Sequence, residues 1–311
     1  MSLADRTPPT VDEFRAYRER FSNWGRWGED DQFGALNLIT PEARAAAAAT
    51  VREGRSVSLS YPLAMEPGPE NLEPVQHEMR LDADHCSDFI GIAYHGRANT
   101  HLDALCHVYT RAGGELFGGH SSAEHITPEG ATTLSVDHWR EGIVTRGVLY
   151  DIPRLRGVDF VSREEPVHGW ELADAAAAAG IEPRAGDAVV IRSGAGPFYA
   201  AHPGFPTGYD DPSRPGVHAS CLEFFHASDA SLLVWDLMDA PMHNEDGSVL
   251  MGAPLHRLTI PYLGMPLLDN AQLEDIAQAC AEAGRWEFML VVAPLVVPRG
   301  TGSPVNPIAV L

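Results

Sequence analysis

Three side chains of the metal-binding type lie close together at the spacing His-x-Asp-x-x-x-His. They are His101, Asp103 and His107. On a strand, residues two positions apart share a face, so His101 and Asp103 would point the same way. A turn or short helix after Asp103 would return His107 to that face. Because imidazole and carboxylate groups bind Zn²⁺ and also harder ions such as Mn²⁺, the spacing predicts a metal site.

Several other catalytic chemistries lack the residues that they require. The chain contains no lysine, which excludes Schiff-base chemistry, a pyridoxal phosphate anchor and a Walker-type phosphate lysine. It has neither the Gly-x-Ser-x-Gly elbow of α/β-hydrolases nor the His-Glu-x-x-His pair of zinc proteases. Cys106 could supply a nucleophile beside His107, but neighbours on an extended chain point to opposite faces. A metal site is therefore the favoured interpretation.

The composition limits the partners and the compartment. The 311 residues carry a formal net charge of −21, which repels phosphate backbones, so we expect no nucleic-acid partner. The four cysteines lie far apart without a Cys-x-x-Cys pair, which suits a reducing compartment. No apolar run is long enough to span a membrane, and the first residues do not resemble a signal peptide. We therefore expect a cytoplasmic protein with no membrane partner.

Apolar periodicity and capping residues predict a mixture of helices and strands. The predicted helices are residues 41–53, 170–179, 218–227 and 271–283. The predicted strands are residues 55–60, 88–94, 145–152, 187–192, 231–237 and 286–297. Because strands and helices do not alternate strictly, the pattern indicates an α/β fold with a mixed sheet.

Motifs along the chain resemble the putative cyclase family of metal-dependent hydrolases, which includes bacterial kynurenine formamidase and isatin hydrolase. The stretch Thr-His-Leu-Asp-Ala-Leu-Cys-His at 100–107 is similar to the family pattern His-x-Gly-Thr-His-x-Asp-x-Pro-x-His. Further similar blocks follow in the family's order at 147–152, 186–194, 254–257, 263–270 and 293–309. The resemblance covers most of the chain and is greatest to the longer subgroup of that family.

This resemblance implies a layered β/β/α swivelling-domain fold with a mixed sheet, and a divalent metal ion used for hydrolysis. It begins near residue 55, so we expect residues 1–54 to be a helical extension and residues 55–311 a single catalytic domain.

The resemblance also implies roles for individual residues. His101, Asp103 and His256 match the metal-binding residues, and Asp269 lies where the family usually has a glutamate. His107 matches the last histidine of the motif, which is either the catalytic base or a further ligand. We expect it to be the base.

One departure from the family pattern bears on the number of metals. Two-metal members carry a histidine four residues before His101, where this chain has Arg97, and a cation there would repel a second metal ion. His95 could replace that histidine only if a β-bulge turned its side chain towards the metal site. We therefore expect one Zn²⁺ or Mn²⁺ per chain, with Arg97 either binding a substrate carboxylate or lying on the surface. Asp236 and Asp239 follow an apolar strand and are candidates to orient the ligands.

The expected function is hydrolysis of an amide, lactam, formamide or lactone bond in a small cyclic or aromatic carbonyl compound by metal-activated water. Two alternatives stay open. One is a metal-dependent cyclase or dehydratase of secondary metabolism, and the other is a binding protein that has kept the fold and lost turnover. Besides the small-molecule substrate we expect a second copy of the chain, in a homodimer or higher even oligomer that makes contact through residues 239–254.

Overall fold

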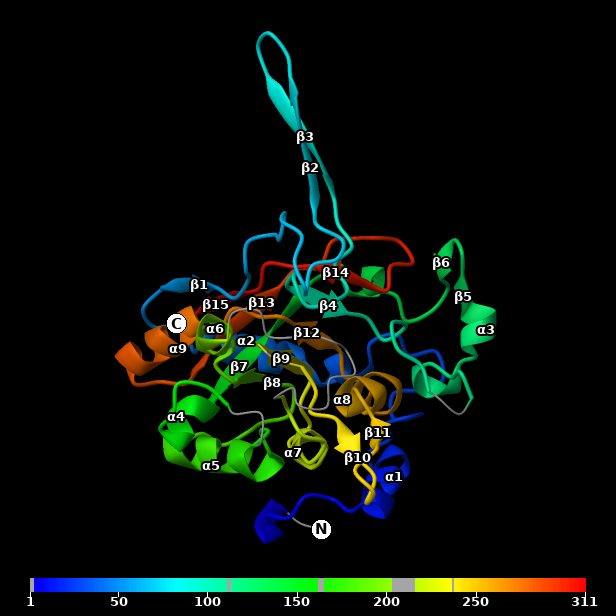
Figure 1. The fold of residues 1–311 in the computed structure, drawn as a ribbon, viewed down its shortest axis with the longest axis vertical. Coiled ribbons are helices and arrows are strands. Elements are labelled where there is room, and N and C mark those ends of the chain that lie inside the picture. The colour runs from blue at the N-terminus through cyan, green and yellow to red at the C-terminus, as the bar shows by residue number, and fades with distance from the viewer. Residues whose placement is uncertain (1–2, 111–112, 162–164, 203–215, 237) are drawn as a thin grey trace.

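The chain folds around one large mixed sheet, shown in Figure 1. The computed structural model describes residues 3–110, 113–161, 165–202, 216–236 and 238–311. In order across the sheet, the nine strands are β1 (Ser56–Ser58), β15 (Ile308–Val310), β13 (Glu287–Val292), β7 (Ile143–Asp151), β8 (Ala188–Arg192), β9 (Leu232–Trp235), β12 (Leu267–Asp269), β4 (His101–Asp103) and β14 (Gly302–Pro304). Strands β7, β8, β9 and β12 are parallel, and the other neighbours pair antiparallel. The predicted α/β class with a mixed sheet is confirmed.

Within the residues that the structure describes, three two-stranded sheets lie outside the large one. They are β2 (Gln76–Leu81) with β3 (Cys86–Gly91), β5 (Ile126–Thr127) with β6 (Gly130–Ala131), and β10 (Met242–His243) with β11 (Val249–Met251). The β2–β3 hairpin projects away from the body of the molecule, at the top of Figure 1.

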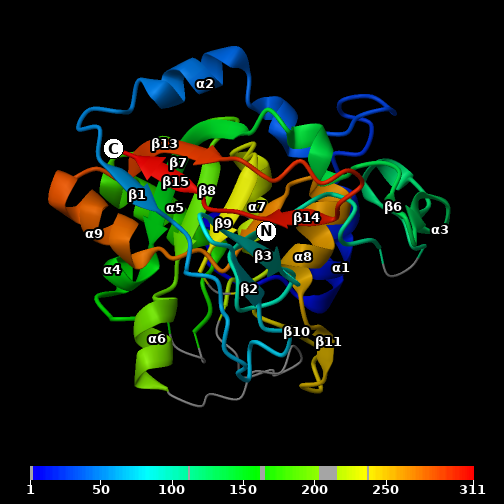
Figure 2. The same ribbon diagram turned by 90° about the horizontal axis from the view of Figure 1, so that it is seen from above.

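Helices cover both sides of the large sheet. They are α1 (Val11–Arg20), α2 (Pro41–Ala48), α3 (Ser122–His125), α4 (Ile152–Arg156), α5 (Gly169–Ala179), α6 (Ala195–Ala201), α7 (Cys221–Ala227), α8 (Pro254–Leu258) and α9 (Glu274–Ala283). Single turns of 3-10 helix occur at Leu3–Asp5, Gly34–Leu38, Phe117–Gly119 and Val136–Trp139, and a π-helical turn occurs at Thr259–Leu263. Figure 2 shows α2 on one side of the sheet and α4 and α9 on the other.

The central strands are buried on both faces, and their sequences reflect this position. Strand β8 reads Ala-Val-Val-Ile-Arg and β9 reads Leu-Leu-Val-Trp, continuous apolar runs rather than alternating ones. Such runs are typical of parallel strands with helices on both sides. The N-terminal helices contribute to the same core, because Phe14, Tyr17 and Phe21 are buried in it.

Several predicted elements are longer in the sequence pattern than in the structure, and for two of them a single residue explains the difference. The strand predicted for 286–297 ends at Val292, because Pro294 has no N–H to donate to a neighbouring strand. The helix predicted for 41–53 ends at Ala48, and the Thr50 hydroxyl donates to the carbonyl of Ala47 at 2.7 Å, which closes the chain into a turn.

No helix in the described part of the chain has the length and apolar character that a membrane span requires.

A buried ion-pair network joins three of the central elements. Arg146 on β7 donates to Asp187, the residue before β8, at 2.6 Å and to Glu287 on β13 at 2.8 Å. The Arg146 and Asp187 side chains are only 5% and 7% exposed, so neither can exchange its partner for bulk water. Removing the guanidinium would leave the Asp187 carboxylate buried without its counter-ion.

We therefore predict that Arg146→Ala lowers the free energy of unfolding by about 3–5 kcal/mol, because a buried charge loses its partner. The matched control is Arg55→Ala, since Arg55 pairs with Glu282 at 2.6 Å on the surface, and exposed pairs are worth about 1 kcal/mol or less. Urea unfolding of both variants measures the two values. Equal losses in the two variants would contradict the structural role assigned to Arg146.

Candidate metal centre

The register of the sheet brings together the residues expected to bind a metal. Strand β4 lies next to β12, and their antiparallel pairing places Asp269 directly opposite His101. His101 and Asp103 are two residues apart on β4 and lie on one face, as predicted. All three side chains are at most 2% exposed. Residues far apart in the sequence therefore meet because one strand pairs with the other.

His256 on α8 completes this group. Its Nε2 atom lies 2.9 Å from Asp269 Oδ2 and 3.9 Å from Asp103 Oδ2. His101 Nε2 lies 3.4 Å from Asp103 Oδ1 and 3.8 Å from Asp269 Oδ2. These separations are close to the roughly 3.3 Å expected between atoms that share one Zn²⁺, with His101 approaching Oδ1 of Asp103 and His256 approaching Oδ2.

The orientation of the two histidines also suits metal binding. His101 Nδ1 lies 2.9 Å from the carbonyl oxygen of Asn99, and His256 Nδ1 lies 2.5 Å from Asp239 Oδ2. Both acceptors fix the ring proton on Nδ1, because a carbonyl and a carboxylate can only accept. In each neutral ring the Nε2 lone pair is then free for a cation.

The buried Asp103 carboxylate gives the strongest indication that a cation belongs here. Among the described residues, no donor makes a well-formed hydrogen bond to either of its oxygens. A buried carboxylate without such partners is costly unless a positive charge lies beside it. Together with the oxygen and nitrogen donor set, this makes the group of His101, Asp103, His256 and Asp269 fit a divalent ion.

His95 and His107 lie on another side of the same carboxylate. His95 Nδ1 is 2.9 Å from Asp103 Oδ1, and His107 Nε2 is 3.7 Å from Asp103 Oδ2. The two rings are stacked, with centroids 3.8 Å apart and planes within 2°. His95 Nε2 also lies 2.9 Å from Thr301 Oγ1, which fixes the ring from the other end.

His95 was expected to lie on a strand and to need a bulge to face the site. This expectation is wrong, because residues 92–100 form no strand. The chain bends there, and the bend turns the imidazole towards Asp103. His95, His101 and Asp103 thereby form a second group whose ligand atoms lie within 4.8 Å of one another.

Charges within the cluster shift the pKa values of its members. Burial opposes charge on His256, but the carboxylates of Asp269 and Asp239 raise the pKa of this imidazole well above its usual value. Although burial favours the protonated acid, His107, His101 and His95 hold the pKa of Asp103 well below its usual range. Burial lowers the pKa of His107 to about 4, although Asp103 acts in the opposite direction. Near pH 7 the centre therefore combines an ionised Asp103 carboxylate with a neutral His107.

Two residues behind the group orient its members. Asp239 accepts from His256 Nδ1 and from the backbone N–H of Leu255, which holds the start of α8 in place. The indole N–H of Trp235 donates to Asp269 Oδ1, so that Oδ2 is directed towards His256. The sequence predicts such a role for Asp239. It gives no sign of the role of Trp235 beyond the position of this residue at the end of β9.

Asp236 has a different role from the one expected. Its carboxylate accepts from three successive backbone N–H groups, those of Ser193, Gly194 and Ala195, at 2.7–3.1 Å. Burial raises the pKa of Asp236 to about 6. The described contacts of Asp236 therefore fix the backbone at the start of α6. They do not orient a residue that is expected to bind the metal.

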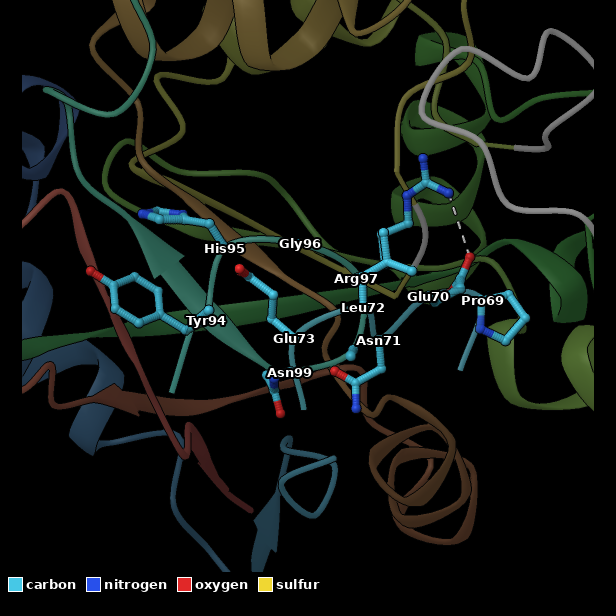
Figure 3. Close-up of a pocket in the computed structure, with 12 residues that line it drawn as sticks. Pro69, Glu70, Asn71, Leu72, Glu73, Tyr94, His95, Gly96, Arg97 and Asn99 are labelled. Carbon is cyan, nitrogen blue, oxygen red and sulfur yellow. Dashed lines mark ion pairs between the residues drawn. The ribbon is translucent and has the colours of Figure 1, made fainter. Parts of the chain in front are cut away.

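A cavity of about 550 Å³ opens beside His95, as Figure 3 shows. Its walls come from residues 69–73, before β2, and from residues 93–99, after β3. Arg97 lines this cavity, and its side chain is only 6% exposed, so the alternative that Arg97 is a surface residue is wrong. Arg97 Nη1 lies 3.6 Å from Glu70 Oε1, the pair drawn with a dashed line in Figure 3. The charge of this arginine is therefore already offset by one carboxylate.

Comparison with known proteins gives one family and several similar folds. Residues 57–241 match the family model described as putative cyclase. The crystal structure of a novel cyclase is similar to the chain with a TM-score of 0.80 and 28% identity, over 94% of this chain and 99% of the other. No match was found among curated proteins.

Two isatin hydrolase structures share the fold at lower identity. One, bound to the product analogue thioisatinate, has a TM-score of 0.56 and 18% identity, over 86% of this chain and 95% of the other. Isatin hydrolase A from Labrenzia aggregata, bound to benzyl benzoate, has a TM-score of 0.57 and 19% identity, over 88% and 98%. At these identities the similarity establishes the fold alone.

We predict that Asp239→Asn lowers the affinity for Zn²⁺ about 10- to 100-fold, because the group that orients His256 loses its charge. Competition with a chelator measures the affinity. Asp236→Asn is the matched control, since it changes another buried carboxylate three residues earlier and should leave the affinity unchanged. A larger loss of affinity in Asp236→Asn than in Asp239→Asn would show that the two roles are reversed.

Proposed function

Because the chain belongs to the putative cyclase family, we propose that it is a metal-dependent hydrolase of a small cyclic or aromatic carbonyl compound. The bond cleaved is an amide, lactam, formamide or lactone bond. The observation that carries the proposal is the buried Asp103 carboxylate, which lies among imidazoles without a well-formed hydrogen bond. The shared fold of the isatin hydrolases supports the same class of reaction.

His101, Asp103, His256 and Asp269 would hold one Zn²⁺ or Mn²⁺. A divalent ion in such a group activates water for attack on a carbonyl carbon and stabilises the negative charge that develops on the carbonyl oxygen. As ligands, the carboxylates of Asp103 and Asp269 would offset the two positive charges of the ion. Burial of all four side chains keeps bulk water from competing for the ligands.

His107 would be the residue that moves the proton. Burial lowers its pKa to about 4, so its ring is neutral near pH 7 and can accept the proton of the attacking water. Its Nε2 lies 3.7 Å from Asp103 Oδ2, and this carboxylate would stabilise the imidazolium that forms. His107 would then pass the proton to the leaving nitrogen or oxygen. Stacking on His95 limits the ring to one orientation during both transfers.

The cavity beside His95 is the place where the substrate would bind. Tyr94 and Asn99 line it together with Arg97, and Tyr94 is held by donation from its hydroxyl to the carbonyl of Gly302 at 2.9 Å. Since Arg97 is already near Glu70, a substrate carboxylate could bind Arg97 only by competing with that residue. The cavity therefore favours neutral carbonyl compounds as substrates.

The proposal is tested by metal analysis and a substrate screen. We expect about one Zn²⁺ or Mn²⁺ per chain, and hydrolysis of a formamide, lactam or lactone with release of protons in weak buffer. His101→Ala should lose metal and activity together, whereas His138→Ala, which removes an exposed imidazole, should lose neither. Stoichiometric metal retained in His101→Ala would refute the ligand assignment. A value near two per chain would refute only the single-metal prediction.

We further predict that His107→Ala retains the metal but loses about two to four orders of magnitude in kcat, the usual contribution of a positioned base. In the wild type, activity should fall as the pH drops through the pKa of His107, because the base becomes protonated. That acidic limb should lie below the ordinary value of 6.5 and should be absent from His107→Ala. If added metal restores the rate of His107→Ala, the residue is a ligand and not the base.

A further inference from the structure

A small cavity lies where α1, β11 and α8 meet, at the opposite end of the molecule from the β2–β3 hairpin (Figure 1). Its volume is about 130 Å³. The apolar part of its wall consists of Phe14, Leu250, Met251, Leu258 and Tyr262. Phe14 and Leu258 are only 3% and 6% exposed, and the ring of Tyr262 stacks on Trp24 with centroids 5.6 Å apart. These contacts hold the apolar wall in place.

The rest of the described lining consists of three arginines. Arg15 and Arg18 belong to α1, and Arg257 belongs to α8. Arg18 lies four residues after Phe14 and three after Arg15, a spacing that places these side chains on one side of the helix. No acidic residue is among the described residues of the lining, although the chain has 43 acidic and only 22 basic residues. We call this cavity the arginine pocket.

Other side chains compensate the charges of these arginines only weakly. Arg15 Nη1 lies 3.2 Å from Asp12 Oδ1, and Arg18 Nε lies 4.0 Å from Glu19 Oε1. The two carboxylates are 92% and 83% exposed, and exposed pairs of this kind contribute little to stability. The half-buried Arg257 guanidinium makes no hydrogen bond or ion pair with a residue of the described ranges. All three guanidinium groups are therefore available to an anion in the pocket.

The positive charge of α1 acts on the wall formed by Tyr262. Burial raises the pKa of the Tyr262 hydroxyl, whereas Arg18 lowers it. Glu115, which is outside the described lining, raises this pKa by a smaller effect than that of Arg18. The stronger charge effect at this wall thus comes from a cation, and an anionic ligand beside Tyr262 would be stabilised.

We propose that the arginine pocket binds a small carboxylate with an apolar body, such as a short aromatic acid. Guanidinium and carboxylate groups match each other in a bidentate geometry, and the apolar wall would cover the body of the ligand. At roughly 30 Å³ per water molecule, the cavity has the volume of about four waters. A single ring or a short chain fits this space, whereas a nucleotide does not. An inorganic anion would leave the apolar wall without a contact.

The arginine pocket is separate from the candidate metal centre, although both use α8. Arg257 directly follows His256, and successive residues of a helix point about 100° apart. His256 faces Asp103 and Asp269, whereas Arg257 lines the pocket. A ligand in the pocket would therefore contact the helix that carries His256 without entering the active site. Its binding can be measured whether or not the chain hydrolyses a carbonyl compound.

Isothermal titration calorimetry of the whole chain with benzoate tests the proposal. We expect saturable binding with a dissociation constant of about 1 mM or lower. Acetate has the carboxylate without the ring, and benzamide has the ring without the charge, so both should bind at least about 10-fold more weakly. Absence of saturation up to about 10 mM benzoate would overturn the proposal. The same holds if either acetate or benzamide binds as tightly as benzoate.

Substitutions on two different elements test where benzoate binds. Arg257→Gln on α8 and Arg18→Gln on α1 should each raise the dissociation constant about 10-fold, because the carboxylate loses a charged donor. Arg20→Gln is the matched control, since it removes the same charge from α1. Arg20 lies outside the described lining and pairs with Glu223 at 3.4 Å. Because its charge is exposed and screened by salt, this control should change the constant by about 2-fold at most.

Metal content and circular dichroism, measured in parallel, separate this site from the metal centre. Both should be unchanged in Arg18→Gln. Benzoate bound at the metal would be insensitive to that substitution. If Arg257→Gln disturbs α8, Arg18→Gln decides the question by itself. Wild-type affinity for benzoate in Arg18→Gln would show that the arginine pocket is not the binding site.

Discussion

The structure of the candidate site depends on one buried carboxylate, that of Asp103. Four imidazoles have a ring nitrogen within 3.9 Å of its oxygens, those of His95, His101, His107 and His256. An ionised carboxylate taken out of water costs several kcal/mol unless positive charge compensates it. The rings of His101 and His256, which when neutral carry their protons on the nitrogen far from Asp103, do not supply that charge. The arrangement is therefore stable only with protons or a cation between the carboxylate and the rings.

Meeting this constraint requires four segments of the chain. Strand β4 carries Asp103, β12 carries Asp269, and the chain after β9 carries Asp239. Since β12 pairs with β9 on one side and β4 on the other, the sheet order itself brings these segments together. Helix α8 adds His256, whose position is fixed by Asp239. A slip of one residue between β4 and β12 would turn Asp269 to the other face and separate the ligands.

Much of this site could be predicted from the sequence. The spacing of His101, Asp103 and His107 indicated a metal centre through strand geometry alone. His256 and Asp269 came only from resemblance to a family, because nothing local shows that residues more than 150 positions further along return to the same point. The mixed α/β class followed from the alternation of apolar runs. Strand ends were less certain, since they depend on single residues such as Pro294.

The errors have physical causes too. The direction of the His95 side chain was inferred from the alternation of side chains along a strand. That alternation does not apply where the chain bends. Asp236 and Asp239 occupy equivalent positions in the sequence pattern, and only the fold shows that one binds backbone N–H groups and the other a histidine. For the β2–β3 hairpin, the sequence pattern predicted only a strand at 88–94. The pairing of β2 with β3 became evident only in the structure.

We propose that the charge of Asp103 holds the cation. Metal analysis of Asp103→Asn tests this proposal, because the substitution keeps the shape of the side chain and removes its charge. After dialysis against a metal-free buffer, we predict that this variant retains about a tenth or less of the wild-type metal. Circular dichroism should show that the fold is retained. Wild-type metal content in Asp103→Asn would contradict the account.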